Sequence, residues 1–210
     1  MKRIILTALI LVVGISLGFS QVITNRTTQQ NTLFGKTRPS GAFVGLSIKP
    51  AYVNGQEAMF TGGQIAIALG KKVNFGVAGY GLLTNVRSNQ LATSGSEYFI
   101  EMGYGGLLIE PILGSDQVIH LAFPILLGAG VSALSQNRPW NGFYDESEYV
   151  NSELFFIAEP GINAELNLFR FMRIAAGVGY RFIGETGVFN VTNTNLSGWT
   201  GNVTLKLGWF

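Results

Sequence analysis

From residue 41 onward, apolar and polar side chains alternate along the chain with a period of two, in segments of about ten residues or more. The clearest segment runs from Met172 to Gly184. Its even-numbered positions as far as Phe182 are apolar, whereas its odd-numbered positions include Arg173 and Arg181. Because successive side chains of a strand point to opposite faces, this pattern predicts a strand with one apolar and one polar face.

Eight segments of this kind are predicted, and the connections between them differ in length. The segments lie near residues 41–53, 60–69, 73–86, 97–113, 118–134, 153–168, 172–184 and 199–209. Short turns are expected at 70–72, 114–117 and 169–171, longer polar loops at 87–96, 135–151 and 186–196, and a short first loop at 54–57. Short turns at one rim and long loops at the other are the pattern of an up-and-down barrel in an outer membrane.

One segment departs from simple alternation. In the 97–113 segment, Glu101 and Glu110 differ in parity, so both can face the polar side only if the register slips between them. A β-bulge adds one residue to a strand and produces such a slip, and a glycine pair is a suitable place for it. We therefore expect a bulge at Gly105-Gly106.

Composition decides whether the apolar face points inward, as in a soluble barrel such as a lipocalin, or outward into lipid. Only 12% of the residues are charged, too few to cover the outside of a soluble domain of this size. The polar face is rich in glycine, as suits a narrow interior, and aromatic residues lie near the predicted strand ends, as in interfacial girdles. In lipid, only a closed barrel satisfies the backbone groups of every strand. The sequence therefore predicts an all-β fold, an eight-stranded antiparallel up-and-down transmembrane β-barrel.

The first forty residues differ from the rest of the chain. Lys2 and Arg3 precede an apolar run, and small residues come before Gln21, so 1–20 is predicted to be a signal peptide cleaved before Gln21. A transmembrane anchor is the alternative, but the run is short for a span. Residues 21–40 form a polar linker, and 41–210 the barrel. The chain has no cysteine, which excludes a disulfide scaffold, a thiolate metal site and a lipoprotein anchor.

The chain ends on alternating apolar positions and two aromatic residues, Leu205-Lys206-Leu207-Gly208-Trp209-Phe210. With the signal peptide and the eight amphipathic strands, this end resembles the small eight-stranded outer-membrane β-barrel proteins of Gram-negative bacteria. The resemblance implies location in the cell outer membrane, contact with its lipid and lipopolysaccharide, and recognition of Trp209 and Phe210 by the barrel-assembly machinery. In that family the terminal Phe usually shares the face of the apolar positions, whereas here Trp209 holds that parity.

Seven charged residues fall on the predicted inner face. They are Lys49, Glu101, Glu159, Glu165, Arg173, Arg181 and Lys206. The interior of an eight-stranded barrel is just wide enough for side chains to fill, so these charges are expected to form an ion network that plugs the lumen. Folding the last pair of long segments about their turn places Arg173 level with Glu165 or Asn167, and Arg181 nearer Glu159. A narrow path for protons or small ions is the alternative, which makes a channel or small-solute transporter the second hypothesis.

Candidate chemistry is sparse. His120 is the only histidine and is expected near the rim of the short turns, on the inner face. A barrel enzyme that resembles the lipid A deacylases would need a serine and a histidine together on the outer face near the long loops. Because His120 is expected at the other end, catalysis is the third and least supported hypothesis. We expect no enzyme activity, no catalytic residue, no cofactor and no metal site. The formal charge of +2 gives no sign of nucleic-acid binding.

The longest loop, 135–151, carries the composition of a binding surface. Its aromatic residues are Trp140, Phe143, Tyr144 and Tyr149, and its acidic residues are Asp145, Glu146 and Glu148. Exposed aromatics amid charge are common at binding surfaces, and the acids could hold a divalent cation. Alternatively, the aromatics fold down onto the barrel rim as part of the aromatic belt. The leading hypothesis is a monomeric, non-enzymatic outer-membrane protein that acts in envelope structure or in surface interaction through its loops.

Overall fold

A computed structural model of the chain describes residues 39–91, 97–135, 149–184 and 196–210. These residues form strands joined by short turns. The strands are β1 (Pro39–Val53), β2 (Gln56–Leu69), β3 (Val73–Leu82), β4 (Val86–Leu91), β5 (Glu97–Leu113), β6 (Ile119–Ala122), β7 (Ile125–Ser135), β8 (Tyr149–Phe169), β9 (Met172–Gly184) and β10 (Gly198–Gly208). The described part of the chain holds no helix long and apolar enough to cross a membrane.

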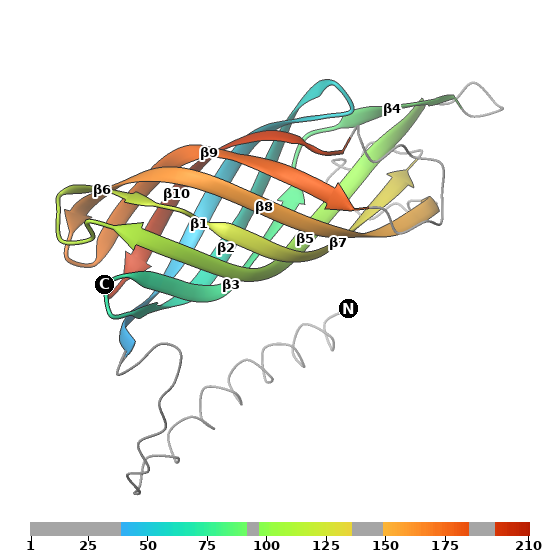
Figure 1. Cartoon of the computed structure of the whole chain (residues 1–210). Helices are drawn as coiled ribbons and strands as arrows, with labels where there is room; N and C mark the ends of the chain where they lie inside the picture. Colours follow the sequence, from blue (N-terminus) through green and yellow to red (C-terminus); the bar gives the residue numbers. More distant parts are fainter. Residues whose placement is uncertain (1–38, 92–96, 136–148, 185–195) are drawn as a thin grey trace, which may run out of the picture. The chain divides into compact units, whose positions relative to one another are not determined.

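The strands form one closed antiparallel barrel (Figure 1). Most strands pair with the next one along the chain, but β3 pairs with β5 instead of β4, β6 and β7 do not pair with each other, and β1 pairs with β10. Two pairs of short strands share one place in the ring, because β3 and β4 both pair with β5, and β6 and β7 both pair with β5 and β8. The ring therefore has eight strand positions, as the alternation predicts.

The gap between β6 and β7 and the gap between β3 and β4 differ in their effect on the strand register. Pro124 follows β6 and has no backbone N–H to donate to a neighbouring strand, yet the register of β6 and β7 against β8 is the same on both sides of it. The register against β5 does shift between β3 and β4. The bulge expected at Gly105-Gly106 is absent, since β5 pairs in unbroken register through these residues with both β3 and β7.

Two glycines allow the barrel wall to close at β5 and β7. A Cβ atom placed on Gly106 would lie 2.6 Å from the Cα atom of Gly128, and one placed on Gly128 would lie 2.0 Å from the carbonyl oxygen of Gly105. These distances are shorter than real contacts of a Cβ atom, so only glycine fits there. Following paired residues once around the ring from Phe43 leads back to β1 near Val53, a stagger of about ten residues that tilts the strands.

The two ends of the barrel differ. At one end, here called the turn end, the short connections 70–72, 114–118 and 170–171 join neighbouring strands. At the opposite end, here called the loop end, β4, β7 and β9 end and β5, β8 and β10 begin, and a two-residue hairpin turn joins β1 to β2. That turn is Asn54-Gly55, and both residues have positive φ, 52° and 73°, as a type I′ turn requires.

Burial alternates along the strands and shows which face meets the surroundings. In β9 and β10 the odd- and even-numbered residues respectively point inward, while large apolar residues such as Val178 (51% exposed) and Val203 (54%) point outward. Similar exposed aliphatic and aromatic side chains occur on β1 to β3, β5 and β8. A soluble monomer rarely exposes so continuous an apolar surface. The outward face is therefore lipid-facing, and the barrel is a transmembrane barrel.

Aromatic residues are exposed at both ends, as interfacial girdles require. Trp199 and Tyr52 lie near the loop end, whereas Phe169, Phe171 and Trp209 lie near the turn end. The signal peptide and most of the linker predicted for residues 1–40 lie outside the described residues.

Candidate functional site

Inward-facing side chains fill the lumen, and six of the seven charged residues expected there are among them. Those six are each at most 8% exposed: Lys49, Glu159, Glu165, Arg173, Arg181 and Lys206. The seventh, Glu101, is half-buried and lies on the outward face of β5, between the buried Ile100 and Met102. The expectation for Glu101 is wrong because β5 has no bulge, so its odd-numbered residues keep the outward face.

The first group of lumen charges, here called the turn-end cluster, is centred on Lys206 of β10. The Lys206 ammonium donates hydrogen bonds to Glu110 of β5, at 2.6 Å, and to Glu165 of β8. The amide of Asn74 donates to the same oxygen of Glu110, also at 2.6 Å. Nε2 of His120 lies 3.0 Å from Glu165 Oε2. One cation thus joins two carboxylates across the barrel, and each carboxylate has a further partner, as buried charges require.

The turn end of the lumen is covered by the last residue of the chain. The Phe210 ring lies 5.3 Å from the ring of the inward-facing Phe43, centroid to centroid, and 3.9 Å from the guanidinium carbon of Arg173. Nη1 of Arg173 lies 4.0 Å from Glu165 Oε2, so the expected pairing of Arg173 with Glu165 is present. Trp209 points the other way and is 76% exposed. The chain end therefore divides its two aromatic residues between the lumen and the lipid-facing surface.

The second group, here called the mid-barrel cluster, is centred on Glu159 of β8. Lys49 of β1 donates a hydrogen bond to Glu159, and so do Tyr104 Oη, at 2.9 Å, and Thr200 Oγ1, at 3.0 Å. The Lys49 ammonium also lies 4.0 Å from the ring centroid of Tyr80, in cation–π contact. The ion pair again links strands that are not neighbours in the ring.

Folding the two segments about their turn predicts that Arg181 lies near Glu159, but in the structure Arg181 does not pair with this carboxylate. Its guanidinium instead donates to the backbone carbonyls of Leu196, at 2.9 Å, and Tyr52, at 3.2 Å, and lies 4.8 Å from the ring centroid of Phe60. The two strands do bring Arg181 level with Glu159, but Lys49, Tyr104 and Thr200 already occupy that carboxylate. Arg181 thus links β9 to the backbone of β1 and of Leu196 near the loop end.

From the middle of the barrel to the loop end, the lumen is filled by apolar side chains. This apolar cluster consists of Ala51, Val53, Ala58, Phe60, Ala78, Val86, Ile100, Met102, Tyr104, Leu108, Leu126, Leu134, Phe155, Ile157, Ile183 and Leu196. Phe60, Val53 and Val86 are fully buried. The lumen therefore has an ionic half toward the turn end and an apolar half toward the loop end.

Little space is left between these groups. A cavity of about 30 Å³ lies among the side chains of the two charged clusters, with Gln64 and Asn202 also lining it. That is roughly the volume of one water molecule in the liquid. The described residues hold no group of three or more His, Cys, Asp or Glu side chains arranged to bind a metal ion. Among the described residues, this arrangement neutralises buried charge and leaves space for about one water molecule between the two charged clusters.

Sequence reasoning placed Glu110 on the polar side only by means of a bulge and left it out of the ion network, and it missed the contact of His120 with Glu165 and the whole apolar cluster. A signal for the apolar cluster was present in the unbroken apolar run from Leu154 to Ala158, because a strand that is apolar on both faces is covered on both. Glu110 is inward on parity with Leu108 and Ile112, without any bulge. The proposed surface residues Trp140, Phe143 and Tyr144 and the acids Asp145, Glu146 and Glu148 lie outside the described residues. Tyr149 is the first residue of β8.

Known proteins resemble the chain in structure rather than in sequence. No protein-family model matches it, and no curated protein matches it. Among solved structures, it is similar to the outer membrane protein OprG from Pseudomonas aeruginosa, with a TM-score of 0.50 and 9% identity over 82% of this chain and 98% of that one. The fold is that of an outer-membrane β-barrel. Together with the outward apolar face, it locates the chain in the cell outer membrane.

Two further structures show a weaker likeness. Neisserial surface protein A (NspA) has a TM-score of 0.48 and 8% identity, over 80% of this chain and 95% of that one. Ail, the attachment invasion locus protein of Yersinia pestis, has a TM-score of 0.43 and 12% identity, over 82% of this chain and all of that one.

Proposed function

We propose that this protein is a non-enzymatic outer-membrane barrel whose lumen is closed by its own side chains, and that it acts in envelope structure or in surface interaction through the segments at its loop end. In this arrangement both chain termini and the turn end face the periplasm, and the loop end faces outward. The observation that carries the proposal is the filling of the lumen along its length, by two ion clusters and then by the apolar cluster.

The place of the lone histidine supports a role without catalysis. His120 is 3% exposed, lies inside the barrel near the turn end and is held against Glu165. A serine nucleophile on the lipid-facing surface near the loop end could not use it as a base, since the two must be within hydrogen-bond reach. The described residues therefore favour structural or interaction roles.

The chain end supports a role for Trp209 and Phe210 that has two parts. Phe210 packs inside the turn end, on Phe43 and Arg173, whereas Trp209 is exposed on the outer surface. We propose that Trp209 is the residue presented to the assembly machinery, since it holds the parity of the apolar positions, and that Phe210 closes the periplasmic mouth of the lumen after folding.

Conductance in planar lipid bilayers tests the closed lumen. The purified barrel is expected to insert without discrete ion-conducting steps, because the apolar half of the lumen excludes hydrated ions. Insertion is verified independently by heat-dependent mobility of the same sample on a detergent gel. Reproducible unitary conductance steps, which scale with barrel concentration, would overturn the closed lumen and favour a narrow channel.

A further inference from the structure

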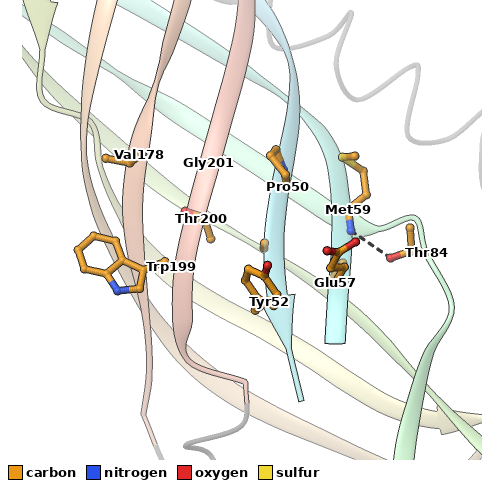
Figure 2. Close-up of a pocket in the computed structure, with 11 residues that line it drawn as sticks. Pro50, Tyr52, Glu57, Met59, Thr84, Val178, Trp199, Thr200 and Gly201 are labelled. Atoms are coloured by element: carbon orange, nitrogen blue, oxygen red, sulfur yellow. Dashed lines mark hydrogen bonds between the residues drawn. The ribbon is translucent and has the colours of Figure 1, made fainter. Parts of the chain in front are cut away.

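A groove runs over the lipid-facing surface of the barrel close to its loop end (Figure 2). Its volume is about 640 Å³, and it crosses β9, β10, β1 and β2. The outward residues that shape it are Val178, Trp199, Gly201, Pro50, Tyr52 and Met59. It lies on the outer wall, in contrast to the filled lumen, and no role considered so far uses it.

The register of the strands explains why the wall is hollow there. Val178 pairs with Gly201, and Pro50 pairs with Met59, so these residues form one row around the barrel. Gly201 has no side chain and forms the floor of the groove; a Cβ atom there would lie 3.1 Å from Pro50 Cγ.

In the next row toward the loop end, the side chains are large. Trp199 is 66% exposed and Tyr52 is 57% exposed, and both border the groove. The Trp199 ring is held edge-on against Tyr180, with the centroids 5.3 Å apart. Two aromatic side chains thus stand beside a floor without side chains, and the ring of Tyr180 holds one of them, Trp199, in its orientation.

The surroundings of the groove are those of the membrane interface. It is continuous with the apolar face that meets lipid, and Trp and Tyr at this height mark the interface between the acyl chains and the head groups. Its volume is within the range of sites that hold one small molecule or chain. At its loop-end edge, Glu57 is the only charged side chain among the described residues that line it, and Thr84 supplies a hydroxyl group.

We propose that the groove is a binding site for one acyl chain of a membrane lipid whose head group carries a primary ammonium, with the Glu57 carboxylate as the partner of that ammonium. A head group with only negative charge is disfavoured, because Glu57 repels it. The proposal rests on the location of the barrel in the membrane and is independent of whether the lumen is closed.

Tryptophan quenching by brominated lipid tests the site. Trp140→Phe and Trp209→Phe leave Trp199 as the single reporter, and the barrel is refolded into vesicles that contain phosphatidylethanolamine or phosphatidylglycerol with brominated acyl chains. Phosphatidylethanolamine is expected to quench Trp199 at about two- to fivefold lower mole fraction than phosphatidylglycerol, the range that one exposed charge pair supports. Equal quenching by both lipids would overturn the head-group assignment.

Variants separate a seated chain from ordinary contact with bulk lipid. Gly201→Leu fills the floor and is expected to abolish the difference between the lipids, as is Val178→Phe, which narrows the groove from β9 and serves if Gly201→Leu does not fold. Ala176→Leu, on the outward face of β9 but outside the groove, keeps the difference. Glu57→Gln keeps quenching by both lipids and removes the preference. If both groove-filling variants retain the wild-type preference, the site does not exist.

Discussion

Replacing Lys206 with methionine is expected to lower the free energy of unfolding of the barrel by about 3–5 kcal/mol, the cost of removing one partner from a buried ion pair. Lys206 is 1% exposed and is the cation that Glu110 and Glu165 share. Methionine fills a similar volume, so the loss reports the two carboxylates left without their cation rather than a cavity. Urea unfolding in detergent micelles, followed by tryptophan fluorescence, measures it.

The same substitution at Lys71 is the matched control. Lys71 pairs with Asp116 at 2.8 Å between two turns, but both side chains are largely exposed, so Lys71→Met is expected to leave the unfolding free energy almost unchanged. The hydrogen bond from Lys71 lowers the pKa of Asp116, so any contribution of this pair is present at neutral pH and is lost as the pH falls through that lowered pKa. Unfolding of Lys71→Met is therefore measured at neutral pH, where any contribution of the Lys71–Asp116 pair is present in full.

A second change identifies the source of the loss at Lys206. Adding Glu110→Gln to Lys206→Met removes one of the stranded charges and leaves an amide beside Asn74. The double variant is expected to be more stable than additivity predicts, by about 0.5–3 kcal/mol. If Lys206→Met costs no more than Lys71→Met, the carboxylates are already in water and the lumen is open.

Adjacent phenylalanines on β8 are expected to respond differently to truncation. Phe155 is 4% exposed and belongs to the apolar cluster, whereas Phe156 is 64% exposed on the lipid-facing surface. Phe155→Ala is expected to cost about 3–5 kcal/mol, because a cavity is added to the lost transfer free energy. Phe156→Ala is expected to cost about 2 kcal/mol, the transfer term alone, since detergent or lipid chains fill the space.

Benzene distinguishes the two variants beyond the size of the loss. A sealed apolar cavity inside a protein binds benzene, so benzene is expected to raise the unfolding free energy of Phe155→Ala and not that of Phe156→Ala. The midpoint of urea unfolding with and without benzene is the measurement. Rescue of Phe156→Ala in place of Phe155→Ala would mean that the faces of β8 are reversed.

Strand position and facing were predictable from the sequence because each depends on a local rule. Met172 to Phe182 alternates cleanly, and the structure exposes Ile174, Val178 and Phe182 as expected. The prediction for Glu101 is wrong because it requires a bulge in β5 that the structure does not have. Glu101 lies close to the loop end of β5, beyond the stretch in which the glycines pack against β3 and β7, and alternation alone places it correctly.

The partners within the lumen were less predictable because they form across the barrel. Arg173 and Glu165 lie on strands joined by one turn, so folding the chain about that turn brought them together correctly. Lys49 lies on β1 and Glu159 on β8, and their contact depends on the stagger with which the ring closes. No local pattern carries that stagger. Whether Lys49 or Arg181 pairs with Glu159 therefore depends on how the barrel closes.

Cysteine accessibility tests the closed lumen most directly, because the natural chain has no cysteine. Thr204→Cys places a thiol on an inward position that is 5% exposed, and Lys72→Cys places one on an exposed turn. With a small charged thiosulfonate reagent, the folded barrel is expected to react at Lys72→Cys and to react at Thr204→Cys only after unfolding in urea. Reaction of Thr204→Cys in the folded barrel at the rate of Lys72→Cys would contradict a lumen closed by its own side chains.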